Sequence, residues 1–321
     1  MVNNNDLYVS VIIPVYGSEL TINELVSQIV STLSGQDNTR KRFEIILVCD
    51  KSPDGSWNKV KALSLRYSEV KGILLRLNAG QHNACMAGFA KSSGQIIITM
   101  DDDLQHSPSD IPKLIEIIEQ GRDVVYARFS KRKHPVWKIL GSYFNDWAAR
   151  YLVSKPRDLY LSSFRAFKAD IRDEILRYQG PFVYVDGLIL GVTRNIASIN
   201  VDHYDRYAGK SFYGFSRSVS LWMKMATGFS IAPLRFTSFM GLFFSCLGFI
   251  LAIVFIIQKF TINMMPNGWS SLIVTILIVA GVQLMALGII GEYIGRLFLT
   301  VNSRPQYLVE EVVGIKMVEK S

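Results

Sequence analysis

The sequence has few charged residues and few cysteines, and both shortages restrict the class of protein. Charged residues make up 19% of the 321 residues, hydrophobic residues make up 49%, and the mean hydropathy is +0.22. A disordered chain needs low hydrophobicity and high charge, so disorder is excluded. The three cysteines, Cys49, Cys85 and Cys246, lack metal-type spacing and fit a reducing compartment without a disulfide framework.

Common nucleotide-binding motifs are absent as well. The chain has no G-x-G-x-x-G and no G-x-x-x-x-G-K-[ST], so neither a standard dinucleotide fold nor a P-loop is indicated. Residues 1–7 are polar, and we expect no secretory signal. The net charge of +8 suits nucleic acid, a membrane surface or a substrate that carries phosphate.

The apolar residues are concentrated in two runs near the C-terminus. Residues 236–257 and 270–291 contain no charged side chain. A helix rises about 1.5 Å per residue, so each run would be about 33 Å long, close to the hydrocarbon thickness of about 30 Å. Two buried core helices are the alternative, but uncharged runs of this length are rare in soluble cores. The short polar link 258–269 therefore predicts a transmembrane hairpin, which favours a membrane and phosphate substrates over nucleic acid.

Basic residues near the two runs predict their orientation. Five flank the runs and one lies in the link: Arg217, Lys224, Arg235, Arg296 and Arg304 against Lys259. By the positive-inside rule, we expect residues 1–215, the tail 292–321 and both termini to be cytoplasmic, in a multi-pass protein of the inner membrane. Residues 216–235 have apolar positions opposite basic ones and are predicted to form an amphipathic juxtamembrane helix and linker.

The first 215 residues predict an α/β fold. Apolar, β-branched runs alternate with segments of helical periodicity. The predicted strands are 9–15, 43–48, 72–77, 95–100 and 123–127, and the predicted helices are 21–33, one ending near Tyr67, 84–91 and 108–119. Such alternation is typical of a mostly parallel sheet covered on both faces, where ligands bind at the carboxyl ends of the strands.

The strongest signal at those ends is the triplet Asp101, Asp102 and Asp103, followed by Gln105. Adjacent carboxylates repel one another unless a cation offsets the repulsion, and their hard oxygens suit Mg²⁺ or Mn²⁺. In an extended segment Asp101 and Asp103 share a face, while Asp102 points away. A solvated acidic turn is the alternative, but the position after a buried strand favours metal binding.

Other strand ends carry weaker signals. Asp50 follows the second strand and suits contact with a base or ribose, whereas Ser52 and Asp54 suit capping of the next helix. Pro14, Tyr16 and Glu19, after the first strand, would form another wall of the same pocket. The segment Arg76 to Asn83 precedes a helix and suits phosphate or sugar contact, or is a polar connection. Cations follow the fifth strand: Arg128, Lys131, Arg132, Lys133 and His134.

Together these segments resemble a known family. VSVIIPVYGSE, DKSPDGS, RLNAGQHNA and MDDDLQH, in this order and with the hairpin, are similar to family-2 inverting glycosyltransferases. More narrowly, they resemble the polyprenyl-phosphate glycosyltransferases, which include bacterial undecaprenyl-phosphate sugar transferases and dolichol-phosphate mannose synthases. The resemblance extends from about Val9 to about Arg304.

The resemblance implies a GT-A fold, a nucleotide-sugar donor and a polyprenyl phosphate acceptor. Asp101 and Asp103 would be the DxD pair that holds Mg²⁺ or Mn²⁺, with help from Gln105. Donor binding is assigned to three groups of residues: Pro14, Tyr16, Glu19 and Asp50 at the nucleoside; Arg76 and Asp102 nearby; and Arg206, Lys210, Ser211 and Tyr213 over the diphosphate. Resemblance to bacterial members favours uridine over guanosine, and the family suggests a homo-oligomer, a tetramer.

The sequence also departs from the family pattern. Ser163 stands before the Phe-Arg pair where many members have Asp, and the nearest upstream carboxylate is Asp158. Lys51 replaces a family Gly, and Cys49-Asp50 replaces a common double Asp. We assign Asp101, Asp103, Asp158 and Arg165 to the catalytic group. In this group Asp158 positions the reacting groups, and Arg165 holds the acceptor phosphate together with Arg128 and Arg132.

The acceptor decides whether a base is needed. A lipid phosphate is already anionic at neutral pH, whereas a hydroxyl acceptor requires a general base. The expected reaction is therefore inverting transfer of a sugar to a polyprenyl phosphate. Two alternatives stay open: a membrane-anchored transferase or polysaccharide synthase with a hydroxyl acceptor, in which Asp186 would be the suspected base, and a non-enzymatic scaffold or receptor.

Overall fold

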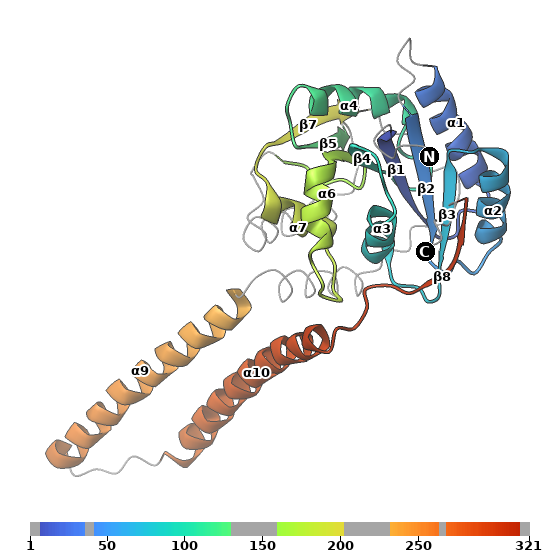
Figure 1. Cartoon of the computed structure of the whole chain (residues 1–321). Helices are drawn as coiled ribbons and strands as arrows, with labels where there is room; N and C mark the ends of the chain where they lie inside the picture. Colours follow the sequence, from blue (N-terminus) through green and yellow to red (C-terminus); the bar gives the residue numbers. More distant parts are fainter. Residues whose placement is uncertain (1–6, 36–41, 130–158, 202–231, 263–267, 315–321) are drawn as a thin grey trace. The chain divides into compact units, whose positions relative to one another are not determined.

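The structure is a computed structural model that describes residues 7–35, 42–129, 159–201, 232–262 and 268–314. It contains two compact units (Figure 1). One unit comprises residues up to 214 together with those from 303 onward, and the other comprises residues 215–302.

The first unit contains one mixed sheet in the order β7-β5-β6-β4-β1-β2-β3-β8. The strands are β1 (Leu7–Val15), β2 (Arg42–Cys49), β3 (Val70–Leu75), β4 (Ile96–Thr99), β5 (Val124–Phe129), β6 (Arg165–Lys168), β7 (Ile196–Val201) and β8 (Val309–Val313). β1 is parallel to β2 and β4, β2 to β3, and β5 to β7; β6 is antiparallel to β4 and β5, and β8 to β3. The predicted α/β fold with a mostly parallel sheet is confirmed.

Helices cover this sheet. They are α1 (Ile22–Ser34), α2 (Ser56–Arg66), α3 (Gln81–Phe89), α4 (Ile111–Glu119), α6 (Ala169–Leu176) and α7 (Val185–Val192). α3 packs against β1 and β2, α2 against β3, and α4 against β5 and β6. α1 shows why the chain folds in this way: Ile22, Leu25, Val26 and Ile29 recur at helical spacing and are fully buried.

Some boundaries differ from the sequence-based ones. The third strand lies at Val70–Leu75 instead of 72–77, and the helix predicted from residue 108 begins with a 3-10 turn, η2 (Pro108–Asp110), that contains a proline. The strands β6, β7 and β8 and the helices α6 and α7 were not predicted. β6 has only four residues, too few for a recognisable period, and β8 has two glutamates among its five residues.

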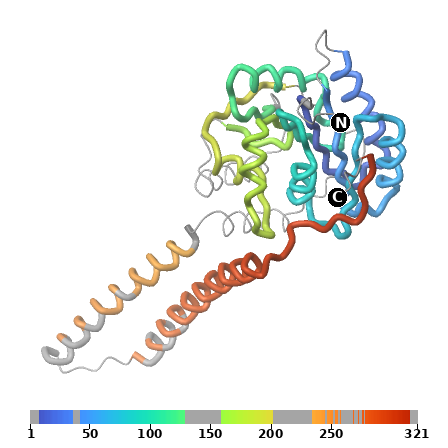
Figure 2. Tube along the Cα trace, viewed as in Figure 1, coloured from blue at the N-terminus to red at the C-terminus, as the bar shows by residue number. Residues whose placement is uncertain are grey.

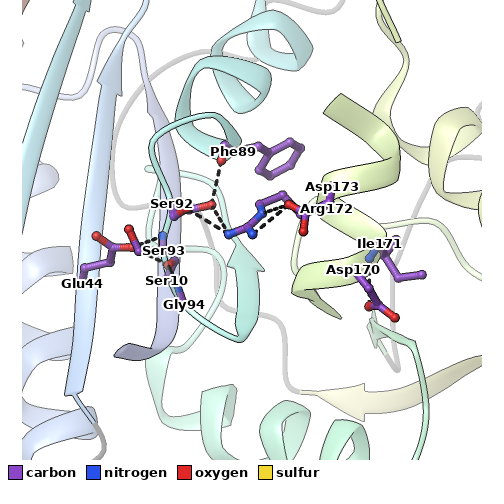
Figure 3. A network of polar contacts seen from close by, with 10 residues as sticks. All are labelled: Ser10, Glu44, Phe89, Ser92, Ser93, Gly94, Asp170, Ile171, Arg172 and Asp173. Carbon is purple, nitrogen blue, oxygen red and sulfur yellow. Dashed lines mark hydrogen bonds and ion pairs between the residues drawn. The ribbon is translucent and has the colours of Figure 1, made fainter. Parts of the chain in front are cut away.

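A polar network joins the amino-terminal parts of the sheet (Figure 3). The buried Glu44 of β2 accepts hydrogen bonds from Ser10 Oγ at 2.6 Å and Ser93 N at 2.7 Å. Glu44 also forms an ion pair with Lys71 of β3. Gly94 N donates to Ser10 Oγ at 2.8 Å. The network therefore fixes β1, β2, β3 and the loop that leads into β4 relative to one another. It lies at the amino-terminal ends of these strands, opposite the ends that carry the acidic triplet.

The second unit contains two long helices, α9 (Ala232–Ile262) and α10 (Trp269–Val301), which are orange and red in Figure 2. Within the described residues, the 24-residue segment Ile278–Val301 has a mean hydropathy of 1.6 and is long and apolar enough to cross a membrane. A shorter apolar segment spans Leu234–Ile250. The crossing itself and its orientation stay predictions.

Candidate active site

Most of the predicted site residues that the structure describes lie on loops at the carboxyl ends of β1, β2, β3 and β4. β1, β2 and β4 are neighbours in the sheet, and all four strands are parallel, so their ends meet at one edge. Hydrogen bonds between the loops interlock this edge.

Asp101, the second residue after β4, accepts a hydrogen bond on each carboxylate oxygen. Gln81 Nε2, from the first residue of α3, donates to Oδ1 at 2.7 Å, and Ser163 Oγ donates to Oδ2 at 2.5 Å. Ser163 is itself positioned, because Thr99 Oγ1 donates to its carbonyl oxygen at 2.6 Å. The Asp101 carboxylate is therefore held from two sides.

Asp102 has different hydrogen-bond partners from those of Asp101. Its Oδ2 accepts hydrogen bonds from Tyr16 N at 2.9 Å and from the Ser18 hydroxyl, and its carbonyl oxygen accepts one from Thr21 Oγ1 at 2.7 Å. Burial raises the pKa of Asp102 to about 6, although these hydrogen bonds to the carboxylate oppose the rise. Asp102 thus ties the β4 loop to the β1 loop, and its role in donor binding stays a prediction.

Asp103 and Gln105 lie in the same turn, in which Leu104 has a positive φ of 60°. Asp103 Oδ1 accepts a hydrogen bond from Gln105 N at 3.2 Å. The turn rests on the buried His106, whose ring stacks on Phe164 with centroids 5.2 Å apart.

Asp50 organises the loop after β3. It is 4% exposed, and its two oxygens accept hydrogen bonds from Ala79 N at 2.7 Å and Gly80 N at 2.8 Å. Burial raises the pKa of Asp50, and the two backbone donors partly offset this rise. Gly80 has a φ of 87°, a conformation that favours glycine. Asp50 therefore fixes the backbone immediately before α3, while its predicted contact with the nucleoside stays a prediction.

The β1 and β2 loops are joined in a similar way. Gly17 N donates to Ser52 Oγ at 2.8 Å, and Gly55 N donates to Glu19 Oε2 at 3.0 Å. Asp54 Oδ1 accepts a hydrogen bond from Ser56 N, in the first turn of α2, at 3.1 Å. Burial alone would raise the pKa of Asp54, but hydrogen bonds, including those from Ser52 and Ser56, lower it below its usual value.

Arg165 and Asp186 form a buried ion pair. Arg165 is 2% exposed, its Nη1 contacts Asp186 Oδ1, and Tyr126 Oη donates to the same oxygen at 3.0 Å. Burial opposes the charge of Arg165, but the Asp186 carboxylate raises its pKa above the usual value. This pairing places both residues inside the domain, so Arg165 contacts a carboxylate where we predicted an acceptor phosphate. Asp186, the suspected base, is occupied by an arginine and a tyrosine.

The other predicted residues fall into two groups. In the described part of the chain, Pro14 lies near the end of β1, the Tyr16 side chain is 52% exposed, and Arg76 and Arg128 are exposed. The remaining six lie outside the described residues: Arg132, Asp158, Arg206, Lys210, Ser211 and Tyr213.

Sequence reasoning did not assign two residues that the structure places at the site. Gln81 lies in the segment Arg76 to Asn83, which precedes a predicted helix. Its position next to a glycine turn is the only sequence feature that indicates a role at the site. Ser163 appears in the sequence as a departure from the family pattern, but no local pattern indicates that it contacts Asp101.

The carboxylate oxygens of Asp101 and Asp103 suit a divalent metal ion as ligands. Among the described residues, no group of three or more His, Cys, Asp and Glu side chains is arranged as a metal cage. Mg²⁺ usually binds through one or two carboxylates together with substrate phosphates. Asp101, with its oriented carboxylate, and Asp103 match that type of site.

Comparison with known proteins identifies the class. Residues 10–172 match the model of glycosyl transferase family 2, and residues 232–297 match the GtrB C-terminal hairpin. The chain therefore belongs to glycosyltransferase family 2, and the predicted family and enzyme class are confirmed.

Its relatives narrow the comparison. Undecaprenyl-phosphate 4-deoxy-4-formamido-L-arabinose transferase of Aeromonas hydrophila is 32% identical over 97% of this chain and 96% of that protein. The Pseudomonas aeruginosa transferase of the same name is 33% identical over 95% and 90%. Glucosyl-3-phosphoglycerate synthase of Mycobacterium tuberculosis, solved with Mn²⁺, uridine diphosphate and phosphoglyceric acid, has a TM-score of 0.50 at 16% identity, covering 70% of this chain and 78% of that one. This last likeness concerns the fold, and the predicted GT-A fold is confirmed.

Proposed function

We propose that the protein transfers a sugar from a uridine diphosphate sugar to the phosphate of undecaprenyl phosphate or a similar polyprenyl phosphate. The transfer takes place at the cytoplasmic face of the inner membrane and inverts the anomeric carbon. The names of the relatives, which align over nearly the whole chain, support this acceptor, and the match to the C-terminal hairpin supports the membrane location.

The observation that carries the proposal is that the carboxylates of Asp101, Asp102 and Asp186 are already held by hydrogen bonds or an ion pair. In the part of the chain that the structure describes, Asp101 is held by two side-chain donors, Asp102 by the β1 loop, and Asp186 by Arg165. Ser163 stands at the position of the family Asp and donates a hydrogen bond. A hydroxyl acceptor needs a base, whereas a phosphate acceptor does not. The arrangement therefore favours an acceptor that is already anionic.

Asp101 and Asp103 would hold Mg²⁺ or Mn²⁺, with Gln105 beside them. When bound, the metal neutralises charge on the donor diphosphate and on the departing nucleotide. The residues of the β1 and β2 loops, Tyr16, Glu19 and Asp50, would form the wall that receives the nucleoside. Of the residues outside the described ranges, Arg206 and Lys210 would cover the diphosphate.

The chemical step requires two anions to approach each other. Two unit charges 4 Å apart interact by about 4 kcal/mol at an effective dielectric constant near 20, so the site needs cations. Arg128 and Arg132 would bind the lipid phosphate. A phosphate oxygen attacks the anomeric carbon, the bond from that carbon to the nucleotide diphosphate breaks, and the diphosphate leaves with the bonding electrons. No proton has to be removed from the acceptor.

Release of nucleotide from the full-length protein tests the proposal. With uridine diphosphate sugars, including the 4-deoxy-4-formamido-L-arabinose conjugate, and Mn²⁺, we expect release that depends on polyprenyl phosphate. Release that depends on a soluble sugar would support a hydroxyl acceptor, and no release with any donor would support a non-enzymatic protein. The Asp101→Ala, Asp103→Ala double variant should fold normally and lose the lipid-dependent release; an unchanged rate contradicts the proposed metal site. The tetrameric state stays a prediction.

A further inference from the structure

The chain after α10 returns to the sheet as β8 and carries a bulge. Leu74 of β3 pairs with Glu311, and Leu75 pairs with Val309, so Glu310 is the extra residue between them. The strand is anchored beyond the bulge, because Arg76 N donates to Leu308 O at 2.7 Å. A bulge turns a side chain away from the regular alternation of the strand. Here the redirected side chain is that of Glu310.

Glu310 contacts the loop that follows β2. Its Oε2 lies 2.7 Å from Lys51 Nζ, and the two side chains are 35% and 46% exposed. Lys51 has a φ of 51°, a left-handed conformation that residues with a side chain adopt rarely. The hydrogen bond from Lys51 lowers the pKa of Glu310 and so favours the charged carboxylate.

Lys51 lies between the residues that join the loops of the site. Asp50, immediately before it, holds the backbone of Ala79 and Gly80, and Ser52, immediately after it, accepts the hydrogen bond of Gly17 N. A shift of the Lys51 backbone would therefore move both connections. The mechanism described above gives neither Lys51 nor Glu310 a role.

We infer that Glu310 is a positioning residue for donor binding: through Lys51, the bulge of β8 holds the β2 loop in the conformation that receives the nucleoside. This inference rests on the proposed function, since it assumes that the loop forms the nucleoside wall. It assigns the segment that follows the membrane hairpin a role in the binding of a nucleoside diphosphate.

Calorimetric titration of uridine diphosphate with Mn²⁺ into the full-length protein tests the inference. Because the pair is partly exposed, we expect Glu310→Gln to weaken binding by only about two- to fivefold. Lys51→Gln should have the same effect, and the double variant should add nothing further. The exchange of charges in Lys51→Glu with Glu310→Lys should restore the affinity, and the KM for polyprenyl phosphate should stay unchanged.

Glu311→Gln is the matched control. Glu311 is the next residue of β8, but it accepts a hydrogen bond from Trp57 Nε1 of α2 at 3.0 Å and does not contact Lys51 in the structure. We expect unchanged binding for this variant. Equal losses in Glu310→Gln and Glu311→Gln would overturn the inference, as would unchanged binding in Glu310→Gln. A much larger loss in Lys51→Gln than in Glu310→Gln would also overturn it, because Lys51 would then contact the nucleotide directly.

Hydrogen–deuterium exchange separates this inference from the proposed donor. If the wild-type protein does not bind uridine diphosphate, the proposed donor is wrong, and exchange in the nucleotide-free protein still tests the positioning role. Glu310→Gln should accelerate the exchange of amides in residues 50–55 and of Ala79 and Gly80, whereas Glu311→Gln should not. Equal exchange in both variants and the wild type would refute the positioning role.

Discussion

Replacing Asp186 with asparagine distinguishes a buried ion pair from a catalytic base. The substitution keeps the size of the side chain and an oxygen that can accept the hydrogen bond of Tyr126 Oη, but it removes the negative charge beside Arg165. The side chains of Arg165 and Asp186 are 3% and 11% exposed, so water cannot replace the lost carboxylate.

The expected magnitude follows from this burial. Removal of one partner of a buried ion pair costs about 3–5 kcal/mol of unfolding free energy, because the other charge stays desolvated and uncompensated. At about 2–4 °C per kcal/mol for a domain of this size, the melting temperature should fall by about 6–20 °C. Replacing both partners with apolar residues, as in Arg165→Met with Asp186→Leu, should recover much of this loss.

Thermal unfolding of the full-length protein in detergent, with the transfer rate measured well below the transition, provides the assay. We expect Asp186→Asn to melt at the lower temperature and to retain a rate within about tenfold of the wild type. Loss of a general base lowers the rate by about 10²–10⁴-fold. An unchanged melting temperature together with a loss of that size would refute our interpretation of Asp186 and favour a hydroxyl acceptor.

Four further substitutions, one of them a control, test other contacts. Ser163→Ala removes one of the two side-chain hydrogen bonds to the carboxylate of Asp101, the proposed metal ligand, so the Mn²⁺ concentration for half-maximal activity should rise about tenfold while the melting temperature stays the same. Gly94→Ala would place a Cβ 2.6 Å from a backbone nitrogen of β1 and should destabilise the protein by about 1–3 kcal/mol, whereas Gly191→Ala, with open space in α7, should be neutral or stabilising in the same melting assay. The hydrogen bond from Lys168 lowers the pKa of Asp123. The stability that Asp123 contributes is therefore present at neutral pH and is lost on acidification. Asp123→Asn should melt below the wild type at pH 7, and the difference should vanish as the pH falls through the folded-state pKa of Asp123.

Local patterns predicted most of the fold and the position of the site. The apolar runs that became β1, β2 and β4 are continuous and buried, and the buried positions of α1 recur at helical spacing. The rule for parallel sheets then placed Asp50 and Asp101 at the same edge. The turning of Asp102 away from Asp101 also followed from the alternation of an extended chain.

Contacts between distant segments could not be predicted in this way. Ser163 and Asp101 are 62 residues apart, and Lys51 and Glu310 are 259 apart. No sequence periodicity links such pairs. The antiparallel strands β6 and β8 pair with strands that are distant in the sequence, and only the tertiary structure brings them together. The buried pair of Arg165 and Asp186 likewise depends on the approach of α7 to the sheet, which no local pattern shows. From the sequence alone, Arg165 was therefore predicted to bind the acceptor phosphate, and Asp186 was the suspected base.

The central claim is that the acceptor is a phosphate that needs no base. Mass spectrometry of the products formed from undecaprenyl phosphate and from undecaprenol, with the same donor and Mn²⁺, tests it most directly. We predict a sugar phosphodiester with the phosphate and no product with the alcohol. Comparable transfer to the alcohol would contradict the claim.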